Sequence, residues 1–142
     1  AVTNQPTEIL RAHRKGKSMN SDVEPLFVQV ARFVEDLVID GTLQPGQQAP
    51  SMNQLAEFHE INPATARKGL SLLVDAGVLE KRRGLGMFVT DGARERILKG
   101  RREAFAGEFV APLIDEAVHL GYSRSDLHQL IDRVAESRGM YQ

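Results

Sequence analysis

Two helix-start signals follow closely on one another in the middle of this chain. The first is Ser51-Met52-Asn53-Gln54, a capping-box pattern in which the serine hydroxyl and the glutamine side chain satisfy free backbone N–H groups. The second is Asn62-Pro63, an N-cap asparagine followed by proline at the first helical position. Between them there is room only for a short helix and a turn through residues 59–61, so two helices are predicted in close succession.

The residues on either side of these signals predict a longer helix before them and define the buried face of the helix after them. The preceding helix begins near Pro25 and ends at Gly41. The helix after Asn62 ends at Gly77, since glycine is a common C-terminal stop. Apolar residues recur at helical spacing in both helices. In the earlier helix they are Leu26, Val30, Phe33, Val34 and Leu37; in the later one they are Ala66, Leu70 and Leu73.

A small β-hairpin is predicted after the third helix. Two short strand candidates, Val78–Lys81 and Met87–Thr90, flank a turn that contains two glycines. A hairpin of this length must pack against the helices to be stable. Three helices followed by a hairpin are the order of a winged helix-turn-helix, in which the third helix enters the major groove of DNA. We therefore predict a mainly α, α+β chain with a winged helix-turn-helix over residues 23–91.

The candidate DNA-binding residues lie on the third helix and on the hairpin turn. Small side chains allow close approach to a groove, and cations meet phosphates or guanine edges. The free N–H groups of the helix N-terminus also suit a phosphate. On the helix the candidates are Asn62, Ala64, Thr65, Arg67 and Lys68; on the turn they are Arg83, Gly84 and Gly86. The alternative for the cations is a solvated surface, and for the glycines a purely conformational role.

Residues 92–142 are predicted to form a two-helix dimerisation region. The first helix begins near Asp91, is kinked or broken by Pro112 and ends at Gly121. The second begins at the cap pattern of residues 123–126. A tail of roughly forty residues can scarcely bury its apolar stripe alone, so pairing with a second copy is the simplest solution. The predicted interface comprises Phe105, Phe109, Leu113, Ile114, Ala117, Leu127, Leu130, Ile131 and Val134.

Residues 1–22 are polar and show no apolar periodicity. We expect a mobile or loosely packed extension of unknown role, because chain ends are commonly poorly ordered. The segment contains Arg11, Arg14, Lys15 and Lys17, so a basic arm on DNA is the alternative.

Composition excludes several classes of function. The chain has no cysteine and a formal net charge of −1, but its basic residues fall in clusters, which suits a protein that binds phosphate with one face. No histidine spacing or carboxylate set fits a metal site, so neither metal nor cofactor is expected. No phosphate loop, nucleophile elbow or carboxylate pair indicates an enzyme. The apolar runs are too short to span a membrane or to form a signal peptide, and a cytoplasmic location is expected.

Short motifs between Pro25 and Val89 stand in a highly specific order and spacing. They are Pro25-Leu26-Phe27, Gln29, Gly41-Thr42-Leu43, Pro45-Gly46, Pro50-Ser51, Leu55-Ala56, Thr65, Arg67, Leu73, Gly77-Val78-Leu79 and Arg83-Gly84-Leu85-Gly86-Met87-Phe88-Val89. In this order they resemble the DNA-binding domain of GntR-type bacterial regulators. The Asn62-Pro63-x-Thr65 turn and the short tail resemble the YtrA-type branch of that family.

The resemblance implies a bacterial homodimer on a palindromic operator, usually a repressor and often near genes for membrane transporters. It carries DNA contact to Ser51, Thr65, Arg67, Arg83, Gly84 and Gly86. Three residues depart from the pattern of many relatives. Asn53 stands where many relatives have arginine, and it can hydrogen-bond a phosphate or base without the charge. Pro63 also stands where many have arginine, although proline is usual in the YtrA-type branch, and Met87 replaces a common threonine.

Two further expectations concern partners. A tail of this size is too small for the ligand cavities of larger GntR relatives, and the sequence does not indicate a small-molecule effector. The alternative function is a protein-interaction adaptor whose winged helix does not bind DNA. The cationic third helix and hairpin turn favour DNA, because an adaptor would not need them.

Overall fold

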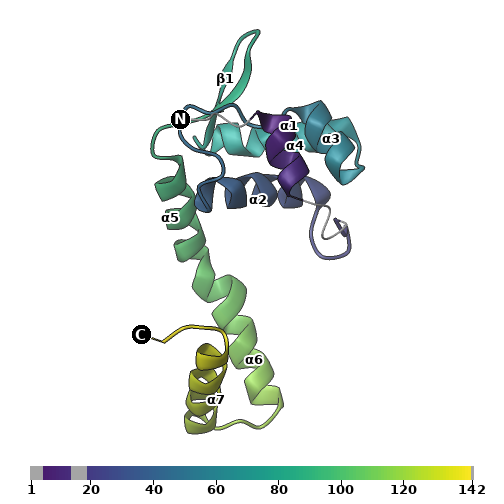
Figure 1. Ribbon diagram of the computed structural model, residues 1–142. Helices are drawn as coiled ribbons and strands as arrows, with labels where there is room; N and C mark the ends of the chain where they lie inside the picture. The colour runs from purple at the N-terminus through teal and green to yellow at the C-terminus, as the bar shows by residue number, and fades with distance from the viewer. Residues whose placement is uncertain (1–4, 14–18, 142) are drawn as a thin grey trace. The chain divides into compact units, whose positions relative to one another are not determined.

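The computed structural model describes residues 5–13 and 19–141 of the chain. It comprises two compact units, residues 1–100 and 101–142. The first unit holds α1 (Pro6–Ala12), α2 (Leu26–Ile39), α3 (Met52–His59), α4 (Pro63–Asp75), β1 (Leu79–Arg82), β2 (Gly86–Val89) and the start of α5 (Ala93–Phe105). The second holds the end of α5, the π-helical η1 (Ala106–Val110), α6 (Ala111–His119) and α7 (Arg124–Ser137). The hairpin projects from the helices of the first unit (Figure 1). The order of three helices and a hairpin confirms the predicted winged helix-turn-helix of the α+β class. The elements from α5 to α7 confirm the predicted helical C-terminal region.

The core of the first unit lies between α2 and α4. The predicted stripe of α4 is buried in it, as are Val30, Val34 and Leu37 of α2. The other two residues of the predicted α2 stripe, Leu26 and Phe33, are half-buried. At Gly69 the two helices lie so close together that an added Cβ would be 2.7 Å from the Phe27 carbonyl oxygen. Ala93 and Ile97 at the start of α5 join the same core, so the compact unit continues to Gly100.

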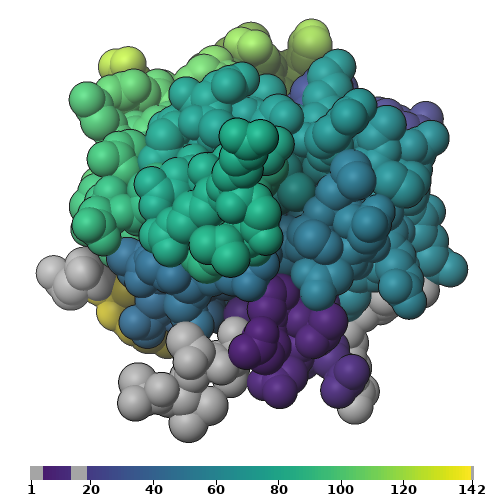
Figure 2. Space-filling model, turned by 90° about the horizontal axis from the view of Figure 1, so that it is seen from above, coloured from purple at the N-terminus to yellow at the C-terminus, as the bar shows by residue number. Residues whose placement is uncertain are grey.

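The N-terminal segment differs from expectation. Residues 6–12 form α1, and its Ile9 and Leu10 are 2% and 5% exposed in the core of the first unit. In Figure 2, α1 (purple) covers part of this unit's surface. The prediction of a loosely packed extension is therefore wrong for residues 6–13, because two apolar neighbours in one short helix give no periodicity to read. Arg11 is exposed, whereas residues 14–18, which include the other predicted basic residues, lie outside the described part.

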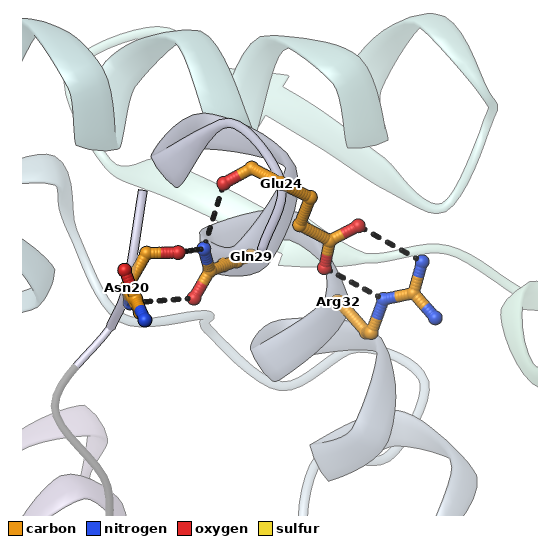
Figure 3. Close-up of polar contacts among 4 residues, drawn as sticks. All are labelled: Asn20, Glu24, Gln29 and Arg32. Atoms are coloured by element: carbon orange, nitrogen blue, oxygen red, sulfur yellow. Dashed lines mark hydrogen bonds and ion pairs between the residues drawn. The ribbon is translucent and has the colours of Figure 1, made fainter. Parts of the chain in front are cut away.

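Polar contacts fix the chain that leads into α2 (Figure 3). The Gln29 amide nitrogen donates to the carbonyl oxygens of Asn20 and Glu24, at 2.6 and 2.8 Å, while the Asn20 N–H donates to the Gln29 Oε1 at 3.3 Å. The Glu24 carboxylate pairs with the Arg32 guanidinium at 3.5 Å. These bonds hold the start of α2, where Phe27 lies against α4.

The hairpin is supported along one edge by a segment that was predicted only as loop. The strands β1 and β2 pair antiparallel, from Leu79 opposite Val89 to Arg82 opposite Gly86. The segment 46–49 then pairs with β2: the N–H groups of Gly46 and Ala49 donate to the carbonyls of Val89 and Met87, each at 2.8 Å. This third segment gives the short hairpin the support that two strands alone would lack.

The second unit contains the predicted interruption at Pro112. The five-residue π-helix η1 precedes α6, and Pro112 lies in the first turn of α6. Proline lacks an N–H, and its ring conflicts with the carbonyl four residues earlier, so a wider turn accommodates it. Ser123 caps the start of α7: its hydroxyl oxygen accepts from the Asp126 N–H at 3.0 Å, as the cap pattern predicted.

Candidate nucleic-acid interface

Both predicted caps form at the starts of α3 and α4. The Ser51 hydroxyl oxygen accepts from the Gln54 N–H at 3.1 Å, and the Gln54 Oε1 accepts from the Ser51 N–H at 2.8 Å. The Asn62 Oδ1 accepts from the Ala64 N–H at 2.8 Å. The caps use only the acceptor oxygens of the Ser51 and Asn62 side chains. The serine hydroxyl proton and the asparagine NH₂ group therefore remain available to an external acceptor.

The candidate residues of α4 lie on its exposed side. Asn62, Ala64, Arg67 and Lys68 are exposed and Thr65 is half-buried, whereas the predicted stripe opposite them is buried. The Arg67 guanidinium makes no hydrogen bond or ion pair with any residue that the structure describes. Its five N–H donors are thus free for a phosphate or the edge of a guanine.

Lys68 is held by an aromatic ring of α2. Its ammonium lies 4.0 Å from the centroid of the Phe27 ring, within the range of a cation–π contact. The contact restricts the conformation of the Lys68 side chain, but it occupies only one side of the ammonium group. Sequence reasoning missed Phe27 as a partner, because the contact depends on how closely α2 and α4 cross.

The wing, formed by β1, β2 and their turn, carries three cations, Lys81, Arg82 and Arg83, and the two arginines lie in different environments. Arg82 donates from Nε and Nη2 to the Glu80 carboxylate at 3.1 and 2.9 Å, and its guanidinium lies 4.2 Å from the centroid of the Phe88 ring. Arg83 is exposed and has no such partner among residues 5–13 and 19–141. The charge that the turn offers to an anion is therefore chiefly that of Arg83.

The two glycines of the turn are required for different reasons. Gly84 has φ +76° and Gly86 has φ +121°, a region that side chains disfavour. A Cβ on Gly84 would meet nothing, whereas one on Gly86 would lie 2.6 Å from the Gln48 amide nitrogen. Figure 2 looks onto this wing, which projects toward the viewer.

Two residues that sequence reasoning missed support the wing. The Gln48 Nε2 donates to the Leu85 carbonyl at 2.8 Å, from the segment that precedes α3. The Arg96 Nη1 of α5 donates to the Gly77 and Asp91 carbonyls at 3.2 and 2.7 Å and so joins the end of α4 to the end of the hairpin. Neither residue belongs to a local motif, so no signal in the sequence could have identified them.

His59 lies in an aromatic cluster at the end of α3. Its ring centroid is 4.7 Å from that of Phe33 and 4.8 Å from that of Phe58, both edge to face. Burial lowers the pKa of His59 to about 4, and its Nε2 has no hydrogen-bond partner.

The described residues contain no group of three or more His, Cys, Asp or Glu side chains that could hold a metal ion. Within the same residues, no helix is long and apolar enough to cross a membrane.

The predicted interface residues of the second unit are mostly exposed in the single chain. Phe105 and Phe109 are 56% and 57% exposed, and their rings lie 5.8 Å apart. Ala117 and Leu127 are buried, and Leu130 is half-buried. The remaining predicted residues are exposed: Leu113, Ile114, Ile131 and Val134.

Comparison with known proteins shows that this chain is similar to bacterial regulators. The model of the gntR family of bacterial regulatory proteins matches residues 26–89. The HTH-type transcriptional repressor YtrA of Bacillus subtilis is 27% identical over 78% of this chain and 85% of its own length. The repressor NagR of the same organism is 34% identical, over 54% of this chain but only 31% of its own length.

A solved structure shows the same fold. It is a transcriptional regulator of the GntR family from Bacteroides thetaiotaomicron, with a TM-score of 0.65 and 24% identity over 80% of this chain and 99% of its own. The matched family and these relatives are transcription regulators, not enzymes.

Proposed function

We propose that this chain, whose residues 26–89 match the gntR family of bacterial regulatory proteins, is a homodimeric repressor that binds a palindromic DNA operator. The observation that carries the proposal is the pair of exposed cations Arg67 and Arg83, which have no partner in the part of the chain that the structure describes. They stand on the two elements that a winged helix-turn-helix directs at DNA, the third helix and the wing.

Each part of the interface has a defined task in this proposal. The exposed face of α4 enters the major groove, where Arg67 meets a base edge or phosphate and Thr65 donates or accepts a hydrogen bond. Lys68 and the N-terminal end of α4, with the Asn62 amide, neutralise or bind phosphates. The small side chain of Ala64 allows the helix to approach the bases.

The wing and the start of α3 contact the sugar–phosphate backbone beside the groove. Arg83 supplies charge at the turn, and Gly84 and Gly86 allow its backbone to approach closely. Ser51 and Asn53, both exposed at the start of α3, donate hydrogen bonds to phosphate oxygens. Asn53 adds no charge, so the operator is expected to differ from those of relatives with arginine there.

The exposed apolar residues of α6 and α7 support dimerisation. An apolar face of this kind on a small helical unit favours association with a second copy, and a two-fold dimer matches a palindromic site. We propose repression because the similar protein YtrA is a repressor. The resemblance to the YtrA-type branch favours transporter genes as targets and the cytoplasm as location.

The test is binding of the purified chain to duplex DNA from upstream of its own gene, measured by fluorescence anisotropy over a range of salt concentrations. We expect affinity on the order of 1,000-fold or more above that for an unrelated duplex. We also expect that affinity to fall steeply with salt, because phosphate contacts release counterions. Weak binding without sequence preference would contradict the proposal and favour the protein-interaction adaptor.

A further inference from the structure

We propose that Gln48 is a positioning residue that fixes the tip of the wing for contact with DNA. The inference rests on the proposed DNA-binding function and deepens it. Gln48 stands in the segment between α2 and α3, and its side-chain amide donates to the carbonyl of Leu85, in the middle of the turn, at 2.8 Å. The bond joins parts of the chain that are 37 residues apart.

The backbone around Gln48 directs its side chain along the wing. The segment 46–49 pairs with β2 through Gly46 and Ala49, and Gln48 stands opposite Phe88. Pairing on both sides of Gln48 fixes its backbone relative to β2. Its side chain then only has to span the short distance from this position to the turn.

Gly86 is matched to Gln48 on the other side of the contact. A Cβ at this position would lie 2.6 Å from the Gln48 amide nitrogen, closer than real Cβ contacts come. The amide therefore occupies the space that a side chain at position 86 would need. In contrast, a Cβ on Gly84 would meet nothing, so the packing constraint belongs to Gly86 alone of the two.

This contact restrains a turn that would otherwise have few constraints. Besides the pairing of Arg82 with Gly86, the turn is closed by a backbone bond from the Leu85 N–H to the Arg82 carbonyl at 2.9 Å, and residues 83–86 are exposed. Glycines at positions 84 and 86 give it many accessible conformations. Ordering such a turn on binding costs conformational entropy, and a restraint present before binding reduces that cost. Gln48 thus holds Arg83 and the Gly84 backbone in one arrangement before DNA is met.

The experiment compares two neighbouring glutamines. Gln48→Met keeps the length of the side chain but removes the donor. Gln47→Met is the matched control, since the Gln47 Oε1 accepts from the Gln44 N–H within the loop, at 2.7 Å, and not from the turn. We expect Gln48→Met to raise the operator Kd about 3- to 10-fold, with little change in Tm or in the salt dependence. Gln47→Met should leave the Kd near that of the wild type.

A double-mutant cycle with Arg83→Ala tests whether Gln48 acts through the wing. If it does, Gln48→Met raises the Kd much less in the Arg83→Ala background. Equal fold-changes in both backgrounds, or an unchanged Kd in the Gln48→Met single variant, would overturn the proposal.

A measurement without DNA separates this inference from the proposed function. NMR order parameters of the Gly84, Leu85 and Gly86 amides should fall in Gln48→Met and stay unchanged in Gln47→Met. If the wild-type chain bound no DNA but the order parameters fell, the function would be wrong and the restraint right. Order parameters that do not differ between Gln48→Met and the wild type would refute the restraint itself.

Discussion

Gly69 sets how closely α4 lies on α2, and through that contact it places the exposed face of α4. An added Cβ would lie 2.7 Å from the Phe27 carbonyl and 2.9 Å from the Val30 side chain. The first neighbour is backbone and cannot rotate away, so the helices would have to separate. Phe27, whose carbonyl makes this close contact, also carries the ring under Lys68. One glycine therefore couples the packing of the core to the position of a candidate DNA-binding cation.

We predict that Gly69→Ala lowers the free energy of unfolding by about 1–3 kcal/mol, the usual cost of overpacking a core. Urea denaturation measures it. The control is Gly100→Ala in α5, where a Cβ meets nothing within 4 Å and alanine should stabilise the helix by up to about 1 kcal/mol. A Gly69→Ala protein as stable as the wild type would show that the two helices are not packed this closely.

Arg67 and Arg82 offer a comparison between a free and a paired guanidinium. We predict that Arg67→Ala lowers operator affinity by about 1–3 kcal/mol, the range for a good base contact. Arg82→Ala should cost less, because Arg82 already pairs with Glu80 and stacks on Phe88. Anisotropy titrations of both variants, with circular dichroism to check folding, measure the difference. Unchanged affinity in a folded Arg67→Ala protein would remove Arg67 from the interface.

His59 makes the stability of the first unit depend on pH. Its pKa is about 4 in the folded chain and near 6.5 when exposed, so the unfolded chain binds the proton more readily between these values. The contribution of neutral His59 is complete above pH 6.5 and is lost progressively as the pH falls toward 4. We predict a lower Tm at pH 5 than at pH 7, measured by thermal unfolding.

The control for this prediction is His59→Phe, which keeps an aromatic ring between Phe33 and Phe58 and cannot titrate. Its Tm should change less between pH 7 and pH 5 than that of the wild type. An equal change in both proteins would mean that other groups cause the pH dependence.

At the scale of elements, the sequence predicts the features that depend on residues within one or two helical turns of each other. The caps at Ser51, Asn62 and Ser123 form as expected, because each depends on a side chain and a backbone N–H a few residues away. The apolar stripe of α4 is buried as expected and that of α2 is buried at three of its five positions, because helical periodicity is local. The order of helices and hairpin followed from these signals, and the fold class followed from the order.

Features that depend on contacts between residues far apart in the chain were not predicted from the sequence. The edge segment 46–49 contains no strand pattern, and it extends only because β2 offers unpaired backbone groups beside it. Gln48 and Arg96 donate to carbonyl groups far along the chain. Nothing in the sequence distinguishes them from other long side chains that can donate a hydrogen bond. The candidate set of the site could be predicted from the third helix and the turn, whereas the residues that hold that set in place could not.

The helix α1 gives a test of an element that sequence reasoning missed. Ile9 is 2% exposed in the core of the first unit, whereas Thr7 on the same helix is exposed. We predict that Ile9→Ala lowers the free energy of unfolding by about 2 kcal/mol or more, the usual cost of such a truncation in a core. Thr7→Ala should change it by less than about 0.5 kcal/mol. Equal stability of the two variants in urea denaturation would mean that α1 does not contribute to the core.

At the scale of the whole molecule, charge and apolar surface are distributed unequally along the chain. The candidate cations belong to the first unit, while many of the large exposed apolar side chains belong to α6, α7 and the residues beside them. The net charge of −1 therefore says little about DNA binding, since electrostatic attraction depends on the local cluster. The same division suggests that each unit meets a different partner, DNA for the first and a second copy for the other.

The proposed contact with a second copy can be tested at Ile131. Ile131 of α7 is 42% exposed in the single chain, so a charge there costs a monomer little but would be buried without a partner in a dimer. We predict that the wild type is a dimer by light scattering and that Ile131→Glu shifts it toward the monomer. Affinity for a palindromic operator should fall at least 10-fold, because two linked domains bind far more tightly than one. Affinity for a duplex that carries a single half-site should stay unchanged.

Val23→Glu is the control, because Val23 is an even more exposed apolar side chain of the first unit, 76% exposed. It should leave both the mass and the operator affinity unchanged, since no dimer contact is assigned to it. A wild-type protein that stays monomeric at micromolar concentration would contradict the dimer. If Ile131→Glu dissociated the dimer without weakening operator binding, the two copies would not act together on DNA, and the palindromic operator would be wrong while the dimer stood.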